Sequence, residues 1–140
     1  MIIIIILAMI KLTAQRQAIL DMITHSNQHW DAELLARALS DAGHSIGIAT
    51  VYRGLTALEE AGLIEAIHLG DKKRYECSNK DHHDHLICTS CGLIEEFCDE
   101  NIEKLQNEVA EANGFHVTGH QLLIFGLCQN CMQSVQSGEK

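Results

Sequence analysis

The sequence contains no proline, and its aromatic residues make up only 4% of the chain. Without proline there is no proline-rich linker. A membrane-spanning run is also missing, because the longest apolar stretch, "MIIIIILAMI" at residues 1–10, is shorter than the roughly 20 residues that a transmembrane helix needs. No basic residue precedes the stretch and no A-x-A cleavage site follows it, so it does not match a secretory signal. We therefore expect a cytoplasmic protein without a membrane partner. The stretch itself either packs on the body as a strand or helix or derives from a mis-assigned start codon.

Basic residues are scarce, with 10 Lys and Arg against 19 Asp and Glu, and the formal net charge is −9. The acidity lies in the second half. Residues 1–80 hold eight basic and nine acidic residues (net −1), whereas residues 81–140 hold two and ten (net −8). Such asymmetry indicates two halves with different roles. We predict one domain over residues 1–79 and a second over 80–140, whose acidic, His- and Cys-rich composition attracts cations.

The first half has the pattern of a winged helix-turn-helix. Apolar periodicity predicts helices over residues 13–24, 31–42 and 48–61, the first two capped by Thr13 and Asp31. The period then shortens, and "LIEAIHL" and "KRYEC" flank the turn signal "GDK". Three helices followed by a hairpin are the order of elements in a winged helix-turn-helix.

The second half mixes strands with one helix. The order predicted is a strand ("HDHLIC"), a knuckle ("TSCG"), a strand ("LIEEF"), a helix over 99–113 and a long strand run ("FHVTGHQLLIFGLC"). The apolar face predicted for the helix consists of Ile102, Leu105, Val109 and Ala112. The predicted fold class of the chain is therefore α+β, with a winged helix-turn-helix in the first half and strands with one helix in the second.

Two C-x-x-C pairs, Cys88 with Cys91 and Cys128 with Cys131, indicate a structural zinc site. Each knuckle brings two sulfurs to one ion, and two knuckles complete a tetrahedral thiolate site. The alternative is a pair of redox dithiols, but Gly92 and a strand-like run follow the first pair where a thioredoxin-like site requires a helix. We expect Cys77 and Cys98 to be small buried apolar residues outside any metal site.

The segment "HHDH" at residues 82–85 is rich in imidazole and carboxylate groups, which are harder metal ligands than thiolates. On a strand, His82 and Asp84 share one face and His83 and His85 the other, so one strand can supply two metal sites. The alternative is a solvated polar strand edge. Donors from elsewhere are needed to complete either site, and the candidates are His29, Glu76, Glu96, Glu103 and His120. The mixed nitrogen and oxygen set suits Fe²⁺, Mn²⁺ or Zn²⁺. The remaining histidines, His25, His44, His68 and His116, are expected to be ordinary surface or core residues.

The third predicted helix carries candidate DNA contacts. Tyr52 and Arg53 lie on the side away from its apolar stripe, where Arg53 could bond a base edge or a phosphate. Thr50 lies near the helix start, where recognition helices meet the groove. Further candidate contacts are Arg16 in the first helix and Lys72 and Lys73 at the hairpin tip. The alternative is a solvated surface that binds no nucleic acid.

Four segments, "GIATVYRGL", "HHDHLICTSCG", "IEEF" and "CQNC", resemble the ferric uptake regulator family of bacterial metal-dependent repressors, over residues 12–132. The resemblance implies an N-terminal winged helix and a C-terminal α+β dimerisation domain. It implies a homodimer, with tetramers left open, that binds AT-rich palindromic DNA operators when loaded with metal. Tyr52 and Arg53 match its recognition-helix contacts.

The same resemblance implies three metal sites. The structural zinc site matches Cys88, Cys91, Cys128 and Cys131. The sensory site matches His29, Glu76, His83, His85 and Glu96. A further site in the dimerisation domain matches His82, Asp84, Glu103 and His120.

Within the family the iron-sensing branch is preferred, with Fe²⁺ as the regulatory ion and Mn²⁺ or Zn²⁺ as its possible replacements. Glu96 stands where the peroxide-sensing branch tends to carry aspartate, and zinc regulators usually lack the full "HHDH". Zinc, manganese and peroxide sensing remain alternatives. We expect no enzymatic activity, because the chain has neither H-E-x-x-H nor the H-x-E and P-C-x-x-C motifs of a deaminase. A metal-buffering or protein-interaction module is the remote alternative.

Overall fold

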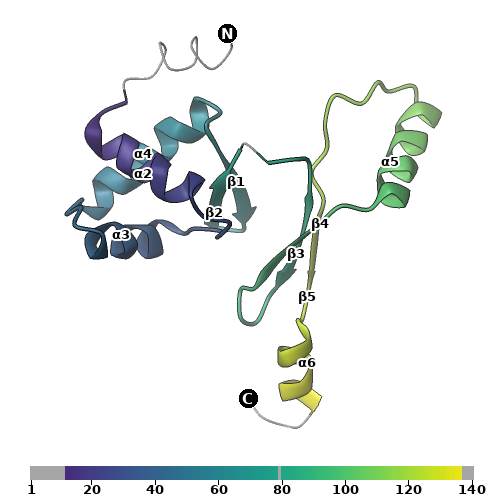
Figure 1. Ribbon diagram of the computed structural model, residues 1–140. Helices are drawn as coiled ribbons and strands as arrows, with labels where there is room; N and C mark the ends of the chain where they lie inside the picture. Colours follow the sequence, from purple (N-terminus) through teal and green to yellow (C-terminus); the bar gives the residue numbers. More distant parts are fainter. Residues whose placement is uncertain (1–11, 79, 137–140) are drawn as a thin grey trace. The chain divides into compact units, whose positions relative to one another are not determined.

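The computed structural model describes residues 12–78 and 80–136 and divides the chain into two compact units (Figure 1). The first unit ends at Lys80 and the second begins at Asp81. The apolar stretch at residues 1–10, and its expected packing, lie outside the described residues. No helix in the described part of the chain is long and apolar enough to cross a membrane.

Three helices form most of the described part of the first unit. They are α2 (Ala14–Thr24), α3 (Ala32–Asp41) and α4 (Ile48–Glu60). The Thr13 side chain accepts a hydrogen bond from the Arg16 N–H, and the Asp31 side chain accepts one from the Leu34 N–H at 2.6 Å, so both predicted caps are confirmed. The fully buried side chains of the helices meet in one core and are Ile19, Ile23, Leu35, Leu39, Val51, Leu55 and Leu58.

Gly54 of α4 leaves room for the side chain of the buried Ile19 of α2. A Cβ atom at this position would lie 2.7 Å from Cδ1 of the buried Ile19, a distance that real Cβ contacts do not show. The glycine therefore has a packing reason for standing in the middle of a helix, where it otherwise costs about 1 kcal/mol relative to alanine.

A two-stranded antiparallel hairpin completes this unit. It consists of β1 (Ile64–Leu69) and β2 (Lys72–Cys77). Trp30, in the loop between α2 and α3, forms a β-bridge with Tyr75 of β2, with N···O distances of 2.8 and 2.7 Å. The bridge fastens the hairpin to the helices. Three helices and an attached wing make the unit a winged helix-turn-helix, which confirms the predicted fold.

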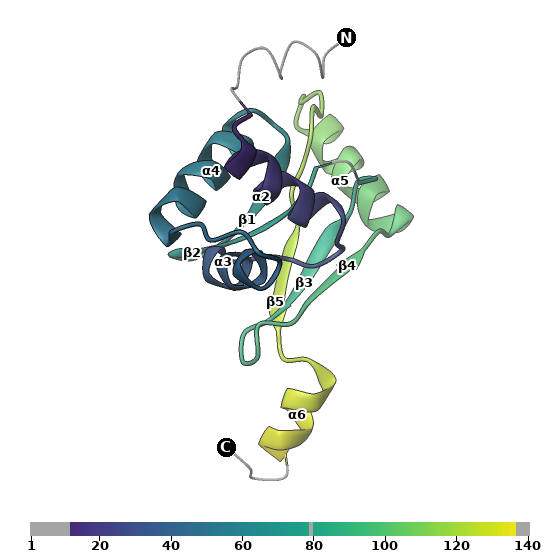
Figure 2. The same cartoon turned by 60° about the vertical axis from the view of Figure 1, so that its left-hand side comes forward.

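The second unit is built on a three-stranded sheet of order β4-β3-β5 (Figure 2). Its elements are β3 (Asp84–Cys88), β4 (Ile94–Phe97), α5 (Glu100–Ala112), β5 (Leu123–Gly126) and α6 (Gln129–Gln136). β4 pairs with β3 antiparallel, whereas β5 pairs with it parallel. The parallel pairing requires the chain to cross over between β4 and β5, and α5 lies in that connection.

Three details of this unit differ from the prediction. The long strand run over residues 115–128 is a strand only at Leu123–Gly126, because β3 offers it just five residues to pair with. The helix α6 was not predicted, since its sequence "QNCMQSVQ" is short and largely polar. The apolar face of α5 is not buried by the described residues of the chain, as Leu105 is 59% and Val109 63% exposed.

Replacing Leu55 with alanine should destabilise the first unit by about 2–5 kcal/mol, because the side chain is fully buried and its loss leaves a cavity. The matched control is Leu55→Met, which keeps the volume and should cost less than about 1.5 kcal/mol. The measurement is urea unfolding at fixed metal content, followed by the emission of Trp30, the one tryptophan of the chain and a member of the same core. Equal midpoints for the two variants would contradict the packing described here.

Candidate metal centres

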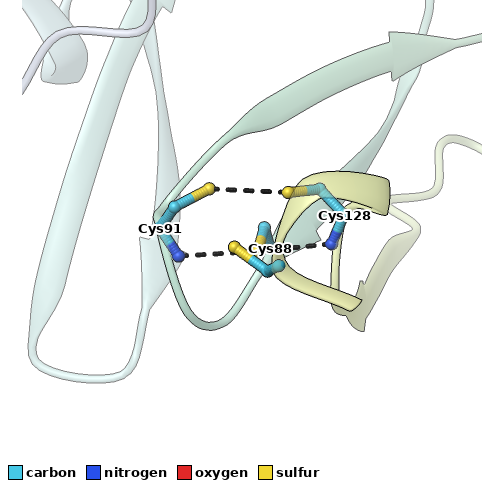
Figure 3. Close-up of side chains that lie close together, drawn as sticks. Cys88, Cys91 and Cys128 are labelled. Atoms are coloured by element: carbon cyan, nitrogen blue, oxygen red, sulfur yellow. Dashed lines mark hydrogen bonds between the residues drawn. The ribbon is translucent and has the colours of Figure 1, made fainter. Parts of the chain in front are cut away.

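The four C-x-x-C cysteines come together at one end of the sheet. Cys88 ends β3, Cys91 follows in the turn, and Cys128 and Cys131 lie at the start of α6 and within it. Their sulfur atoms all lie within 4.8 Å of one another, and the Cys91 and Cys128 sulfurs, which face each other in Figure 3, are 3.8 Å apart. Two thiolates on one tetrahedral zinc ion, each at about 2.3 Å, are also separated by about 3.8 Å. The cluster therefore fits a zinc ion.

Backbone groups prepare this cluster for a cation. The N–H groups of Cys91 and Cys128 donate to Cys88 Sγ at 3.5 and 3.4 Å and lower the pKa of that thiol to about 6. At Cys131, Ser90 lowers the pKa, but the combined opposing effect of the neighbouring thiols and of burial raises it to about 12. One thiol thus ionises readily, whereas four thiolates require a cation to offset their mutual repulsion.

A second cluster in this unit combines His82, Asp84, Glu103 and His120, whose ligand atoms also lie within 4.8 Å of one another. His82 Nε2 lies 2.8 Å from His120 Nε2 and 3.1 Å from Glu103 Oε1, and Asp84 Oδ1 lies 3.6 and 3.5 Å from the two imidazole nitrogens. Nitrogen and oxygen atoms that share a tetrahedral ion are about 3.4 Å apart. The donor set therefore fits a divalent cation.

Asp84 is the residue of that cluster that most needs a positive charge beside it. Its side chain is 1% exposed, and neither carboxylate oxygen has a hydrogen-bond partner. A buried carboxylate without hydrogen bonds is costly unless a positive charge stands beside it. Protonated imidazoles can supply part of that charge, and a metal ion held by both imidazoles and both carboxylates can supply all of it.

A third group in the second unit consists of His83, His85 and Glu96. His83 Nε2 lies 3.5 Å from Glu96 Oε1. The ring centroids of His83 and His85 are 4.7 Å apart, and His85 stands opposite Glu96 in the β3–β4 register. The Asp81 carbonyl lies 2.9 Å from His83 Nδ1, an arrangement that holds the ring with Nε2 toward Glu96. The two faces of "HHDH" thus lead to two different clusters.

The two candidate ligands of the first unit form a pair of their own. His29 Nε2 lies 2.8 Å from Glu76 Oε2, and Lys80 Nζ lies 3.8 Å from the same oxygen. Glu76 is 1% exposed, on β2. This unit therefore holds one nitrogen donor and one oxygen donor close together, but two donors alone do not complete a coordination sphere.

The other histidines and cysteines divide as follows. His25, His44, His68 and His116 are exposed and stand outside these clusters, as expected. Cys77 belongs to the core of the first unit, also as expected. The expected burial of Cys98 is wrong, because this residue is exposed and its sulfur lies 3.8 Å from Glu103 Oε1. Desolvation and the neighbouring carboxylate of Glu103 raise the pKa of its thiol.

The exposed side of α4 carries the candidate DNA contacts. Tyr52 is 50% exposed, and Arg53 donates to Thr50 Oγ1 at 3.1 Å, on the face opposite the buried Leu55 and Leu58. The predicted orientation of Tyr52 and Arg53 is therefore confirmed.

The wing carries the other cations of this surface. Lys72 and Lys73 are both exposed, and Lys73 Nζ lies 3.3 Å from Glu59 Oε1 of α4. Arg16, also a candidate contact, is half-buried in the first turn of α2.

The model of the Ferric uptake regulator family matches residues 8–125 of this chain. A ferric uptake regulation protein from Neisseria meningitidis is 42% identical over 124 residues, which cover 87% of this chain and 86% of that protein. Among solved structures, a ferric uptake regulator from Francisella tularensis with iron is 34% identical, with a TM-score of 0.81 over 88% of this chain and 95% of that one. The Helicobacter pylori ferric uptake regulator, reported to have three functional metal binding sites, is 33% identical, with a TM-score of 0.79 over 84% of this chain and 81% of that one.

Proposed function

Since the chain belongs to the ferric uptake regulator family, we propose that it is a metal-responsive transcriptional repressor that senses iron and binds AT-rich palindromic operators as a metal-loaded homodimer. The observation that carries the proposal is the presence, in one chain, of a winged helix with exposed Tyr52 and Arg53 and of a second unit rich in clustered metal donors. A metal-buffering module would not need the first feature. The family consists of transcriptional regulators, and we propose no catalytic role.

The reading element is α4. Arg53 contacts a base edge or phosphate in the major groove, and Tyr52 packs on a thymine methyl or bonds a phosphate. Thr50, beside Arg53, lies near the N-terminus of the helix, the end that enters the groove in this class of protein. Lys72 and Lys73 of the wing and Arg16 of α2 add contacts to the DNA backbone.

The second unit is the dimerisation domain. Several large apolar side chains on it are exposed in the single chain, among them Leu105, Val109, Phe115 and Phe125 at 54–73%. Surfaces of this kind indicate a partner, because monomeric proteins rarely expose contiguous large apolar patches. A second copy of the chain covers them, in line with the family's dimeric regulators, and supplies the second recognition helix for the other half of a palindrome.

The four-cysteine cluster is the structural zinc site. Bound zinc would neutralise its thiolates and join the start of α6 to the end of β3. The two knuckles are far apart in the sequence, so the zinc ion would close a long loop of the chain and stabilise the folded state.

The sensory ligands are His29 and Glu76 from the first unit and His83, His85 and Glu96 from the second. The pair of His29 and Glu76 is too small for a complete coordination sphere, so the proposal adds the three donors of the second unit. Mixed nitrogen and oxygen donors suit Fe²⁺, Mn²⁺ or Zn²⁺. Iron is preferred because the curated relatives are ferric uptake regulators, with zinc, manganese or peroxide sensing as the alternatives. A bound cation changes DNA affinity only as far as it prefers the DNA-competent arrangement of the chain.

The structural zinc can be tested through its ligands. Cys91→Ser and Cys128→Ser should each lose the zinc that co-purifies with the protein and lower its melting temperature, because zinc bound only by the folded state stabilises that state. Metal content is measured by mass spectrometry on dialysed protein. The control Cys77→Ala removes a thiol from the other unit and should keep its zinc. Zinc retained at the wild-type level in both ligand variants would contradict the assignment.

Metal dependence of DNA binding is measured by fluorescence anisotropy on a labelled AT-rich inverted repeat at fixed salt. Protein holding only its structural zinc should bind the duplex tightly after addition of Mn²⁺, used in place of Fe²⁺, or of Zn²⁺. His83→Ala and Glu96→Ala should lose at least about tenfold in metal affinity and with it most of the metal-dependent gain. His116→Ala, an exposed histidine outside the clusters, is the matched control. An unchanged metal response in both ligand variants would rule out the proposed sensory site.

Base reading is tested with Arg53→Ala, which should weaken operator binding by about 1–3 kcal/mol and relax the preference for operator over unrelated DNA. Lys72→Ala should instead weaken binding to all sequences alike and reduce the slope of log K against log salt by about one. Arg37→Ala, on the exposed side of α3, is the control. The outcome that counts against the proposal is an Arg53 variant with wild-type affinity and specificity.

A further inference from the structure

Cys98 stands where the start of α5 brings it against a candidate metal ligand. The N-cap of α5 is Asp99, whose side chain accepts hydrogen bonds from the N–H groups of Asn101 and Ile102 at 2.9 and 3.2 Å. Cys98 therefore occupies the position before the cap, and Glu103 the fourth position of the helix. Residues at these two positions pack together when a helix is capped in this way, and they are usually both apolar.

Here the pair consists of a thiol and a carboxylate. Cys98 Sγ lies 3.8 Å from Glu103 Oε1, and the same oxygen lies 3.1 Å from His82 Nε2. A sulfur at about 2.3 Å and an oxygen at about 2.1 Å from one five-coordinate ion are about 3.1–3.8 Å apart, for angles of about 90–120° at the ion. The observed separation is therefore close to that of two ligands of a common ion, and it is held by the cap.

An independent observation favours a cation at this place. Asp84, 1% exposed and without a hydrogen-bond partner on either oxygen, faces His82 and His120 in the same cluster. Glu103 adds a second carboxylate. The four clustered donors are His82, Asp84, Glu103 and His120, and Cys98 lies outside this group. Its thiol contacts the cluster through Glu103.

We propose that Cys98 is a thiolate ligand of the metal site formed by His82, Asp84, Glu103 and His120, and that it makes this site selective for a thiophilic divalent cation, Zn²⁺ or Co²⁺, over Mn²⁺. The inference rests on the proposed metal-binding role of those four residues. Sulfur enters as a fifth donor, an expansion that zinc tolerates. Binding releases the thiol proton to solvent, so that Cys–SH and M²⁺ give Cys–S–M and H⁺. Soft thiolate donors favour zinc and cobalt over manganese, which prefers oxygen.

The test uses full-length protein that retains zinc in its four-cysteine cluster and is then titrated with Co²⁺. The wild type should develop a thiolate-to-cobalt charge-transfer band in the near ultraviolet, together with the visible bands of the bound ion. Cys98→Ser, nearly isosteric at an exposed position, should lose the charge-transfer band, keep visible bands from nitrogen and oxygen ligation, and bind Co²⁺ at least about tenfold more weakly. Manganese affinity should be unchanged. Cys77→Ala is the matched thiol control and should keep the band.

Zinc content is measured in the same samples, so that replacement of structural zinc by cobalt is recognised and excluded. His120→Ala, which removes another donor, should weaken Co²⁺ binding in the wild-type background. Absence of the band in the wild type, or its persistence in Cys98→Ser at full zinc content, would overturn the proposal. Metal-dependent operator binding of the wild type and of Cys98→Ser is recorded in parallel. Its absence in both would count against the proposed repressor function, while the cobalt spectrum would still decide the role of Cys98.

Discussion

The alternation of side chains along β3 is the constraint on which the metal chemistry of this protein depends. β3 is the central strand of its sheet, and its five residues run from Asp84 to Cys88. Asp84 belongs to the cluster with His82, its neighbour His85 stands opposite Glu96, and Cys88 belongs to the thiol cluster. Because both neighbouring strands hydrogen-bond to β3, none of these three side chains can change face without a shift in register of the whole sheet.

The acidity of this part of the chain limits how the groups on this strand can be neutralised. Residues 81–140 carry ten Asp and Glu against two Lys and Arg, so lysine and arginine offer little charge to offset the buried Asp84 or four thiolates. Placing such groups in a sheet without counter-charge costs free energy. Bound divalent ions would supply the missing charge, which couples the stability of this unit to its metal content.

Sequence reasoning succeeded where the determining physics is local. Caps at Thr13 and Asp31 and the hairpin turn need only neighbours in the chain, and they agree with the structure. The members of "HHDH" alternate between two clusters as predicted, although His82 and His83 precede the strand β3. It failed where a distant partner decides. Residues 115–122 do not extend β5, since strand β3 is too short to pair with them, and Cys98 is exposed, since no element of the described chain covers it. The contact of Cys98 with Glu103 also has a local signal, because these two residues occupy the positions that pack together around a helix cap at Asp99.

In the proposed repressor, dimerisation accounts for how so acidic a chain binds DNA. One winged helix carries few cations, and Lys73 already pairs with Glu59, so a single unit offers little attraction to phosphates. Two such units held by a common dimerisation domain bind the second half-site as an effectively intramolecular step, which multiplies weak affinities without new contacts. The gain vanishes when the two recognition helices cannot reach both half-sites together. A sparse basic surface is therefore an advantage for a metal sensor, because it leaves the affinity under the control of the geometry that metal binding sets.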